Sequence, residues 1–300
     1  MNKRKKIIFL ISGIGCVFLL ILGIGLYFLH HFFEKSVNEK VGLLQTVDSF
    51  LTLNFDGEKE KQLKEERSMM NVEHVSIYYF EDDAVLLPIT NETLDWAKEL
   101  NDDLLGDYKK RPLDLIYFKD TEELSHFASL NNISGYYSDF DKVIGIISED
   151  KEGIVKGLET PLFHFQKTLL HEYTHYAFNQ KLNQLKITTT IPQWFEEGVC
   201  EYVSYDQTIL SPSPFTFVPL NELTSYEDWN HARTIDDIEP YKQSYLTIDF
   251  LIGEYGKEVI VEILEATKSH SDFNKGYENV TGIPLVKVEE QVIQSVKIET

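Results

Sequence analysis

The residues with the clearest chemical potential lie at positions 171–175, which read His-Glu-Tyr-Thr-His. His171 and His175 are four residues apart, so on a helix they lie on one face, about one turn from each other, and can reach the same metal ion. Glu172 follows the first histidine, and its carboxylate can point at a water on the metal without binding the metal itself. Two nitrogen ligands, an open coordination position and a base beside the water are what a zinc-dependent hydrolase needs.

The sequence on both sides of this pattern predicts a long, largely apolar helix. Pro161 suits the first turn of a helix, and Thr160 just before it is a candidate N-cap. Apolar residues continue through Phe178. A metal site inside a domain core would use such a helix. The alternative is a core helix whose two histidines have a purely structural role.

A catalytic zinc ion usually has three protein ligands and one water, so a third ligand must come from another segment. The segment 192–202 offers Glu197 and Glu201, which are four residues apart and project from one helical face. Glu197 can bind the metal, and Glu201 can accept a hydrogen bond from the free ring nitrogen of a ligand histidine. Gly198 would let this helix approach the zinc helix closely. The alternative, a solvated acidic face, is disfavoured because the segment is rich in large apolar residues.

The strings HEYTH and WFEEGVCEY together resemble the gluzincin superfamily of zinc peptidases. In that superfamily a W-x-x-E-G-x-A-x-Y segment follows the zinc helix and its first Glu is the third ligand, which implies this role for Glu197. Cys200 stands where the superfamily usually has alanine, and we expect it to be a small buried residue. The string HEYTHY is also similar to bacterial collagenases, whose second segment likewise reads E-G-x-A-E.

A third segment, residues 241–256, is similar to the tyrosine-bearing helix of aminopeptidase N-type gluzincins. This resemblance implies that Tyr241 stabilises the transition state, with Tyr245 as a near competitor one turn away. Those aminopeptidases also carry a G-x-M-E-N strand whose Glu holds the free amino terminus of the substrate, and residues 135–150 contain no such string. We therefore expect endopeptidase activity. The β-branched run 143–148 predicts an edge strand that could pair with an extended peptide.

The N-terminus predicts a membrane anchor. Four basic residues at positions 3–6 precede an uncharged apolar run from Ile7 to Leu29. As a helix this run is about 34 Å long, enough to cross about 30 Å of hydrocarbon. Because basic residues stay on the cytoplasmic side, we expect residues 1–6 in the cytoplasm and the rest of the chain outside. The alternative, a cleaved signal peptide, is disfavoured because the run exceeds the about 7–15 apolar residues of a signal core and no small-residue cleavage site follows.

The net charge limits the classes of partner, and the positions of the cysteines limit the disulfides. The chain has 28 Lys and Arg against 49 Asp and Glu, for a net charge of −21, and four of the basic residues belong to the cytoplasmic end. An exported surface this acidic argues against nucleic acid and anionic lipid as partners, and it favours basic substrates or serves solubility alone. Cys16 and Cys200 are the two cysteines of the sequence, and the membrane would separate them, so we expect no disulfide framework.

The remaining pattern predicts an α+β fold. Residues 30–70 are expected to form a juxtamembrane helical stalk and residues 71–300 the catalytic domain. Strands are expected at 72–80, 113–118 and 143–148, and helices from Thr90 or Asn91 to 105, from 121, and at 193–203, 240–255, 257–268 and 284–296. We thus expect a small twisted sheet with flanking helices, then a helical subdomain, with zinc in the cleft between them. The resemblance implies that this arrangement is zincin-like.

Together these observations predict a membrane-anchored extracytoplasmic endopeptidase that uses Zn²⁺ and an activated water to hydrolyse peptides or proteins. The expected ligands are His171, His175 and Glu197, with Glu172 as the base, Tyr241 as the donor to the developing oxyanion and Glu201 as the outer partner of a ligand histidine. One alternative is a catalytically silent ectodomain that uses the fold for binding or sensing. Another is a zinc hydrolase for a different amide or ester. Glu172 favours an enzyme, because a structural metal site needs no base.

Overall fold

The computed structural model of the protein describes residues 3–36, 41–52, 56–130, 133–204 and 215–298. The chain divides into two compact units, Met1–Glu66 and Arg67–Thr300. The described part of the first unit consists of α1 (Lys3–Ser36), α2 (Leu43–Thr52) and α3 (Glu58–Glu65). Residues 37–40 and 53–55 of the predicted stalk lie outside the described residues.

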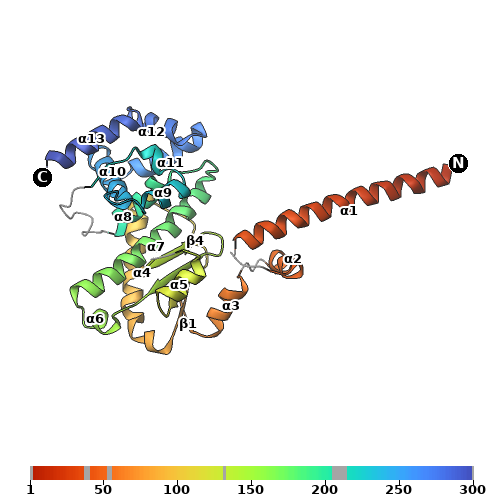
Figure 1. Ribbon diagram of the computed structural model, residues 1–300, viewed down its shortest axis with the longest axis horizontal. Coiled ribbons are helices and arrows are strands. Elements are labelled where there is room, and N and C mark those ends of the chain that lie inside the picture. Colours follow the sequence, from red (N-terminus) through yellow and green to blue (C-terminus); the bar gives the residue numbers. More distant parts are fainter. Residues whose placement is uncertain (1–2, 37–40, 53–55, 131–132, 205–214, 299–300) are drawn as a thin grey trace. The chain divides into compact units, whose positions relative to one another are not determined.

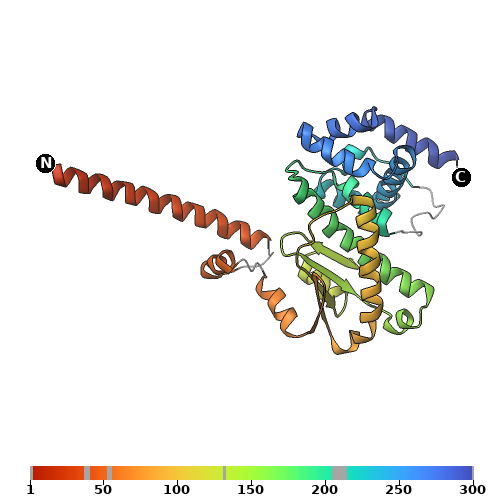
Figure 2. The same cartoon turned by 180° about the vertical axis from the view of Figure 1, so that it is seen from behind.

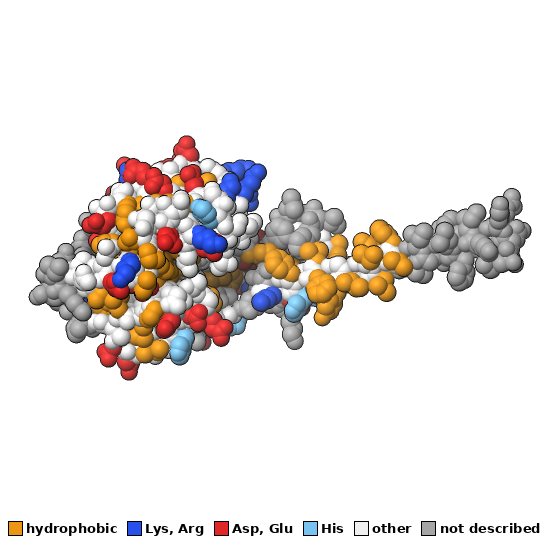
Figure 3. Space-filling model, turned by 90° about the horizontal axis from the view of Figure 1, so that it is seen from above, with side chains coloured by type: hydrophobic (Ala, Val, Ile, Leu, Met, Phe, Trp, Pro, Cys, Tyr) orange, Lys and Arg blue, Asp and Glu red, His pale blue; other side chains and the backbone are white. Residues whose placement is uncertain are grey.

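Helix α1 contains a segment that is long and apolar enough to cross a membrane, Val17–Lys35, with a mean hydropathy of 1.7. Most of its large apolar side chains are exposed, and they form the orange surface along this part of the helix in Figure 3. Exposed apolar surface of this extent is unfavourable in water and calls for a lipid or protein covering. A signal sequence near the N-terminus has the same features, so the orientation across a membrane stays a prediction.

The second unit contains one five-stranded sheet with the strand order β1-β2-β3-β5-β4. The strands are β1 (Ser68–Val72), β2 (Val75–Tyr79), β3 (Leu113–Phe118), β4 (Gly135–Ser138) and β5 (Val143–Ile147). Strands β2, β3 and β5 run parallel to one another, whereas β1 and β4 are antiparallel to their neighbours. The sheet is therefore mixed, with a short antiparallel strand at each edge.

Two strand predictions need correction. Residues 72–80 do not form one strand, because Glu73 takes a left-handed conformation with φ of 54° and the chain reverses there into the β1–β2 hairpin. The run 143–148 does form a strand, β5, but it is not an edge strand. Strand β5 lies between β3 and β4, and its residues 143–146 are all buried. The edge of the sheet on this side is the short strand β4.

Helices cover both faces of the sheet, as Figures 1 and 2 show from opposite sides. Helices α4 (Leu87–Leu105) and α7 (Glu159–Leu185) pack against one face and share one hydrophobic core with it, while α5 (Thr121–Ala128) contacts the other face. Helix α4 begins three residues before the predicted Thr90. Pro88 lies in its first turn, and the Thr90 hydroxyl donates a hydrogen bond of 2.8 Å to the Leu86 carbonyl instead of capping the helix.

The rest of the second unit is helical, which confirms an α+β fold. Helix α6 (Lys151–Val155) precedes α7, and Figure 1 shows α7 lying between the sheet and the later helices. These are α8 (Gln193–Ser204), α9 (Tyr226–Ala232), α10 (Pro240–Tyr255), α11 (Val259–His270), α12 (Phe273–Thr281) and α13 (Leu285–Ile298). Helices α8, α10, α11 and α13 match predicted ones to within a few residues, and α6, α9 and α12 were not predicted.

Candidate metal centre

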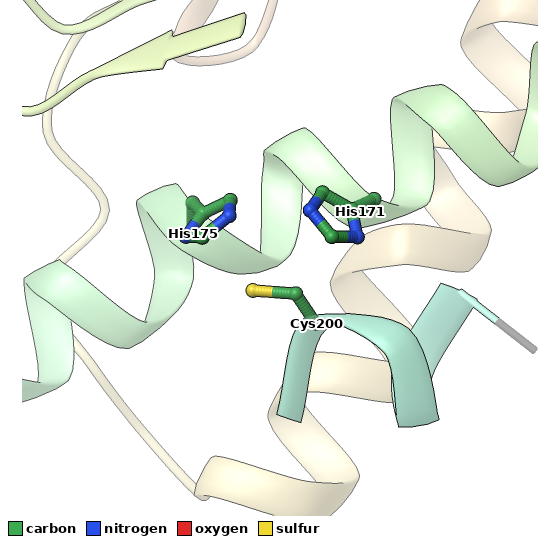
Figure 4. Close-up of side chains that lie close together, drawn as sticks. All are labelled: His171, His175 and Cys200. Carbon is green, nitrogen blue, oxygen red and sulfur yellow. The ribbon is translucent and has the colours of Figure 1, made fainter. Parts of the chain in front are cut away.

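Helix α7 carries both histidines of the motif on one face. It begins at Glu159, so the prediction of Thr160 as its N-cap is wrong by two residues; Leu158 occupies the cap position, and Pro161 lies in the first turn as expected. The rings of His171 and His175 project from successive turns, with their centroids 4.9 Å apart. Figure 4 shows both rings pointing from α7 toward α8.

Helix α8 crosses α7 and presents Glu197 to both rings. Its Oε2 atom lies 3.4 Å from His171 Nε2 and 3.6 Å from His175 Nε2. Ligands at about 2.0–2.2 Å from a tetrahedral zinc ion are about 3.3–3.6 Å from one another, so these separations fit a shared ion. Glu197 Oε1 accepts a hydrogen bond of 2.9 Å from Gln193, but the buried Oε2 has no hydrogen-bond partner among the described residues. A divalent cation bound between this anionic oxygen and the two imidazole nitrogens would give the oxygen the partner that it lacks among the described residues.

The charges of this cluster are strongly coupled. Burial alone would raise the pKa of Glu197, yet the two neighbouring imidazoles hold that pKa well below its usual range. Burial alone would lower the pKa of His171, but the carboxylates of Glu197 and Glu201 raise it to about 9. In the absence of a metal the buried carboxylate therefore draws a proton onto a histidine, and a divalent cation could replace that proton.

Cys200 is a second nearby donor on α8. It is fully buried, and its sulfur and the donor nitrogens of His171 and His175 all lie within 4.8 Å of one another. Figure 4 shows the thiol pointing toward the histidine pair. Burial raises the pKa of this thiol to about 12, so the sulfur keeps its proton, and the thiol is a poor ligand in that state. The anionic Glu197 is therefore the better candidate for a third ligand.

The outer nitrogen of each histidine faces its own carboxylate. His171 Nδ1 lies 3.0 Å from Glu201 Oε1, and Glu201 is the carboxylate that the sequence analysis expects beside a ligand histidine. His175 Nδ1 lies 2.9 Å from Glu196 Oε1, a partner that the sequence analysis did not identify. Asn179 donates to the same Glu196 oxygen at 3.1 Å and to the His175 carbonyl at 3.0 Å. Carboxylates in these positions orient a ligand ring and make its inner nitrogen more basic.

Glu172 lies beside the histidines and against the edge strand β4. Its side chain is buried, and this burial raises its pKa, although both histidines oppose the rise. A Cβ atom added to Gly135 would lie only 2.5 Å from Glu172 Oε1, so the glycine on β4 makes room for the carboxylate. Gly135 was not identified from the sequence, because its role depends on a contact between segments 37 residues apart.

Tyr241 and Tyr245 lie in different surroundings, although they are one turn apart on α10. The ring of Tyr241 is 6.3 Å from that of His171, and the guanidinium of Arg233 lies 5.4 Å from the Tyr241 ring centroid. Burial raises the pKa of the Tyr241 phenol, so it keeps its proton and can donate it in a hydrogen bond. Tyr245 instead stacks on Tyr202, with the ring centroids 6.3 Å apart.

A cleft of about 650 Å³ opens at this cluster, and the residues that line it include His171, Glu172, Glu201 and Tyr241. The structure thus brings together all six site residues that the sequence predicts, across α7, α8 and α10. Gly198 has a different partner from the predicted one. A Cβ atom there would lie 2.7 Å from the Ser244 carbonyl oxygen, so the glycine allows α8 to approach α10 and not α7.

Comparison with known proteins gives two matches. Residues 159–285 match the model of the collagenase family of peptidases (Peptidase M9), which is a family of zinc metallopeptidases. The chain is also 32% identical over 234 residues to the uncharacterized protein YhcO of Bacillus subtilis (strain 168), an alignment that covers 76% of this chain and 73% of YhcO. The chain belongs to the YhcO family.

The collagenase match runs from the first residue of α7 to the first residue of α13. The match therefore contains all six predicted site residues, and it does not include the strands of the sheet. The similarity to YhcO extends over far more of the chain than the collagenase match does. This chain is thus similar to zinc metallopeptidases in the part that carries the candidate site.

Proposed function

We propose that the protein is a zinc-dependent endopeptidase of zincin-like fold, anchored in the membrane with its second unit outside the cytoplasm. The observation that carries the proposal is the orphaned Oε2 of Glu197, which faces the inner nitrogens of His171 and His175 beside the buried carboxylate of Glu172. The collagenase match over the same residues supports it. A structural metal site would explain the three ligands, but it would not explain a buried base next to them.

Each side chain of the candidate site has a separate role in the proposed reaction. His171, His175 and Glu197 would hold the zinc ion, which when bound lowers the pKa of a water to about 7 and polarises a carbonyl. Glu172 takes a proton from the attacking water and passes it to the leaving amine, a role that its raised pKa favours. The Tyr241 phenol donates to the oxygen on which negative charge develops. Glu201 and Glu196 fix the orientation of the two histidine rings.

The substrate class follows from the strand beside the site. Strand β4 pairs with β5 along one side, and it lies at the edge of the sheet directly against Glu172. An open edge can bind an extended peptide through main-chain hydrogen bonds without requiring a chain end. The segment 135–150 contains no G-x-M-E-N string, which in aminopeptidases carries the Glu that binds the amino terminus, so internal cleavage is the activity that we propose.

The change Glu172→Gln tests the catalytic assignment. The amide has nearly the same shape but cannot accept the proton, so we expect turnover to fall by about 10²–10⁴-fold with zinc content and folding unchanged. Zinc is measured by elemental analysis and turnover with peptides that the wild-type protein cleaves. If the variant retains zinc and cleaves at the wild-type rate, Glu172 is not the base.

The orientation has its own test. The basic residues before the apolar segment of α1 predict, by the positive-inside rule, that the N-terminus lies in the cytoplasm. A protease added to intact cells should therefore degrade the second unit and leave the apolar segment in the membrane. Complete protection of the second unit in intact cells, with degradation after lysis, would reject this orientation.

A further inference from the structure

Basic and acidic side chains alternate along the contact between α7 and α8. The basic groups come from α7, at positions four residues apart on one face of that helix, and the acidic groups come from α8. Each group lies between 2.9 and 3.6 Å from the next one. The order along this row is Lys167, Glu201, His171, Glu197, His175 and Glu196. The candidate metal centre is therefore the middle of a longer row, which continues past the first histidine to a lysine.

The two ends of the row have the same construction but different groups. Asn179 lies one turn after the second histidine on α7 and donates a hydrogen bond of 3.1 Å to Glu196 Oε1. Lys167 lies one turn before the first histidine, and its Nζ atom is 3.4 Å from Glu201 Oε2. Each outer carboxylate thus has a histidine on one side and a further α7 side chain on the other.

The Glu201 carboxylate is buried, with its side chain only 3% exposed. Its Oε1 atom lies 3.0 Å from His171 Nδ1, whereas its Oε2 atom has no hydrogen-bond partner among the described residues. The ion pair with Lys167 is the contact that the structure shows for Oε2. A buried carboxylate oxygen without a cation beside it is costly, because burial removes it from water. Lys167 therefore stabilises Glu201 in this position.

Neighbouring carboxylates act against this position of Glu201. Glu197 lies one turn earlier on the same face of α8, and like charges at that spacing repel each other. The charge of Glu201 also contributes to the raised pKa of Glu172, so these two carboxylates interact across the site. Glu201 and Lys167 both line the cleft. Without the lysine, we expect the Glu201 carboxylate to turn away from His171 toward water in the cleft.

We propose that Lys167 is a positioning residue of the candidate metal centre, which holds Glu201 against His171 and so keeps the imidazole in the orientation that binds metal. This role rests on the proposed function in one respect, because it takes zinc as the ion held at this centre. A nearby cation also repels a metal ion, which weakens binding. Since Lys167 is 24% exposed, water screens this repulsion, whereas its contact with the buried Glu201 is direct. The net effect of Lys167 is therefore tighter zinc binding.

The variant Lys167→Met tests the sign of this effect, because it removes the charge and keeps nearly the same length. In the full-length protein in detergent, zinc affinity should fall by about 10-fold, the lower end of the range for outer partners of a ligand histidine. Lys167→Arg keeps the charge and should retain most of the affinity. Competition with a chromophoric chelator measures each affinity. A higher or unchanged affinity in Lys167→Met would overturn the proposal. Lys167→Gln, which is also neutral, replaces this variant if methionine prevents folding.

Lys156→Met is the matched control for the loss of one positive charge. Lys156 pairs with Glu152 on the surface, where the two side chains are 61% and 79% exposed. Zinc affinity should be the same in this variant as in the wild type. A fall as large as that in Lys167→Met would show that net charge, and not the contact with Glu201, determines the affinity, and would overturn the proposal.

A double-mutant cycle tests whether Lys167 acts through Glu201. In the Glu201→Gln background, Lys167→Met should cause no further loss of zinc affinity, because the carboxylate that the lysine holds is already absent. The visible spectrum of the Co²⁺-loaded protein is a second readout, since it depends on the geometry of the ligands. Lys167→Met should change this spectrum in the same direction as Glu201→Gln does. Equal losses of affinity in both backgrounds, or a wild-type spectrum in Lys167→Met, would overturn the proposal.

These measurements use no peptide, so they separate the role of Lys167 from the proposed function. Zinc affinity that depends on Lys167 in a protein that cleaves no peptide would reject the peptidase and keep the positioning role. Peptide cleavage by a protein whose zinc affinity is independent of Lys167 would reject the positioning role alone. A wild-type protein that binds no zinc would reject both.

Discussion

A glutamate carboxylate lies beside the outer nitrogen of each histidine. Glu196 is 2.9 Å from His175 Nδ1, and Glu201 is 3.0 Å from His171 Nδ1. From the sequence alone, substitution of Glu196 was expected to have little effect, because Glu197 and Glu201 account for both expected roles on one helical face. The structure changes that expectation. Each histidine of the candidate centre lies beside its own carboxylate, and Asn179 donates a hydrogen bond to Glu196.

Substitutions in this group should differ in their effect on metal binding. Glu197→Ala removes a ligand and should abolish stoichiometric zinc binding. Glu196→Ala and Glu201→Ala should each weaken zinc affinity or activity by about 10–100-fold, as the loss of an outer partner usually does. Competition with a chromophoric chelator measures the affinities. Wild-type affinity in Glu196→Ala would show that His175 needs no carboxylate partner.

Tyr241 and Tyr245 provide a matched pair on one helix. A phenol near the scissile carbonyl helps only as negative charge grows on the oxygen, so it acts on the chemical step. Tyr241→Phe should lower turnover by about 10²–10³-fold with zinc content unchanged, and Tyr245→Phe should be mild because Tyr245 packs on Tyr202. Equal, near-normal turnover of the two variants would remove Tyr241 from the mechanism.

At the scale of elements, glycines allow two close contacts around the candidate site. Gly198 lets α8 lie against α10, and Gly135 lets β4 lie against Glu172 on α7. A side chain at either position would collide with α10 or with side chains of α7. Because Glu197 directly precedes Gly198, the contact between α8 and α10 also helps to position this candidate ligand.

Gly198→Ala should therefore destabilise the second unit. The added Cβ meets the Ser244 carbonyl and the Ile248 side chain, both at 2.7 Å, and such overpacking costs about 1–3 kcal/mol. Gly253→Ala is the matched control on α10, because nothing lies within 4 Å of the added atom and alanine is the better helix former by up to about 1 kcal/mol. Thermal unfolding should show a lower Tm for Gly198→Ala and an equal or higher Tm for Gly253→Ala. The opposite order would contradict this packing account.

The sequence predicts the site better than it predicts the surroundings of the site. The ligands on α7 and α8 follow from spacing within single helices, and those helices are long and apolar enough to leave a clear pattern. The edge strand β4 has four residues and helix α9 has seven, so neither leaves a periodic signal. Glu196 pairs with His175 because α8 packs against α7 at this place, and a contact between two helices leaves no signal in the spacing within either one.

At the scale of the whole molecule, the chain combines an apolar N-terminal helix with a second unit that carries the candidate metal centre. Acidic side chains are widely scattered over the face of the second unit in Figure 3, in keeping with the net charge of −21. Charge of one sign over a surface makes copies of a protein repel one another. The cleft is lined by charged and apolar residues together with His171, Glu172, Glu201 and Tyr241 of the candidate site.

The most direct test of a zinc endopeptidase is cleavage of an unbiased peptide library by the full-length protein, with the products identified by mass spectrometry. The account predicts internal cleavage that stops when a chelator removes the metal and returns when one equivalent of zinc is added per chain. Glu197→Ala, assayed in parallel, should not recover with the same amount of zinc. Cleavage that continues at full rate in the chelated, metal-free protein would contradict the account, as would a zinc-loaded, folded protein that cleaves no peptide in the library.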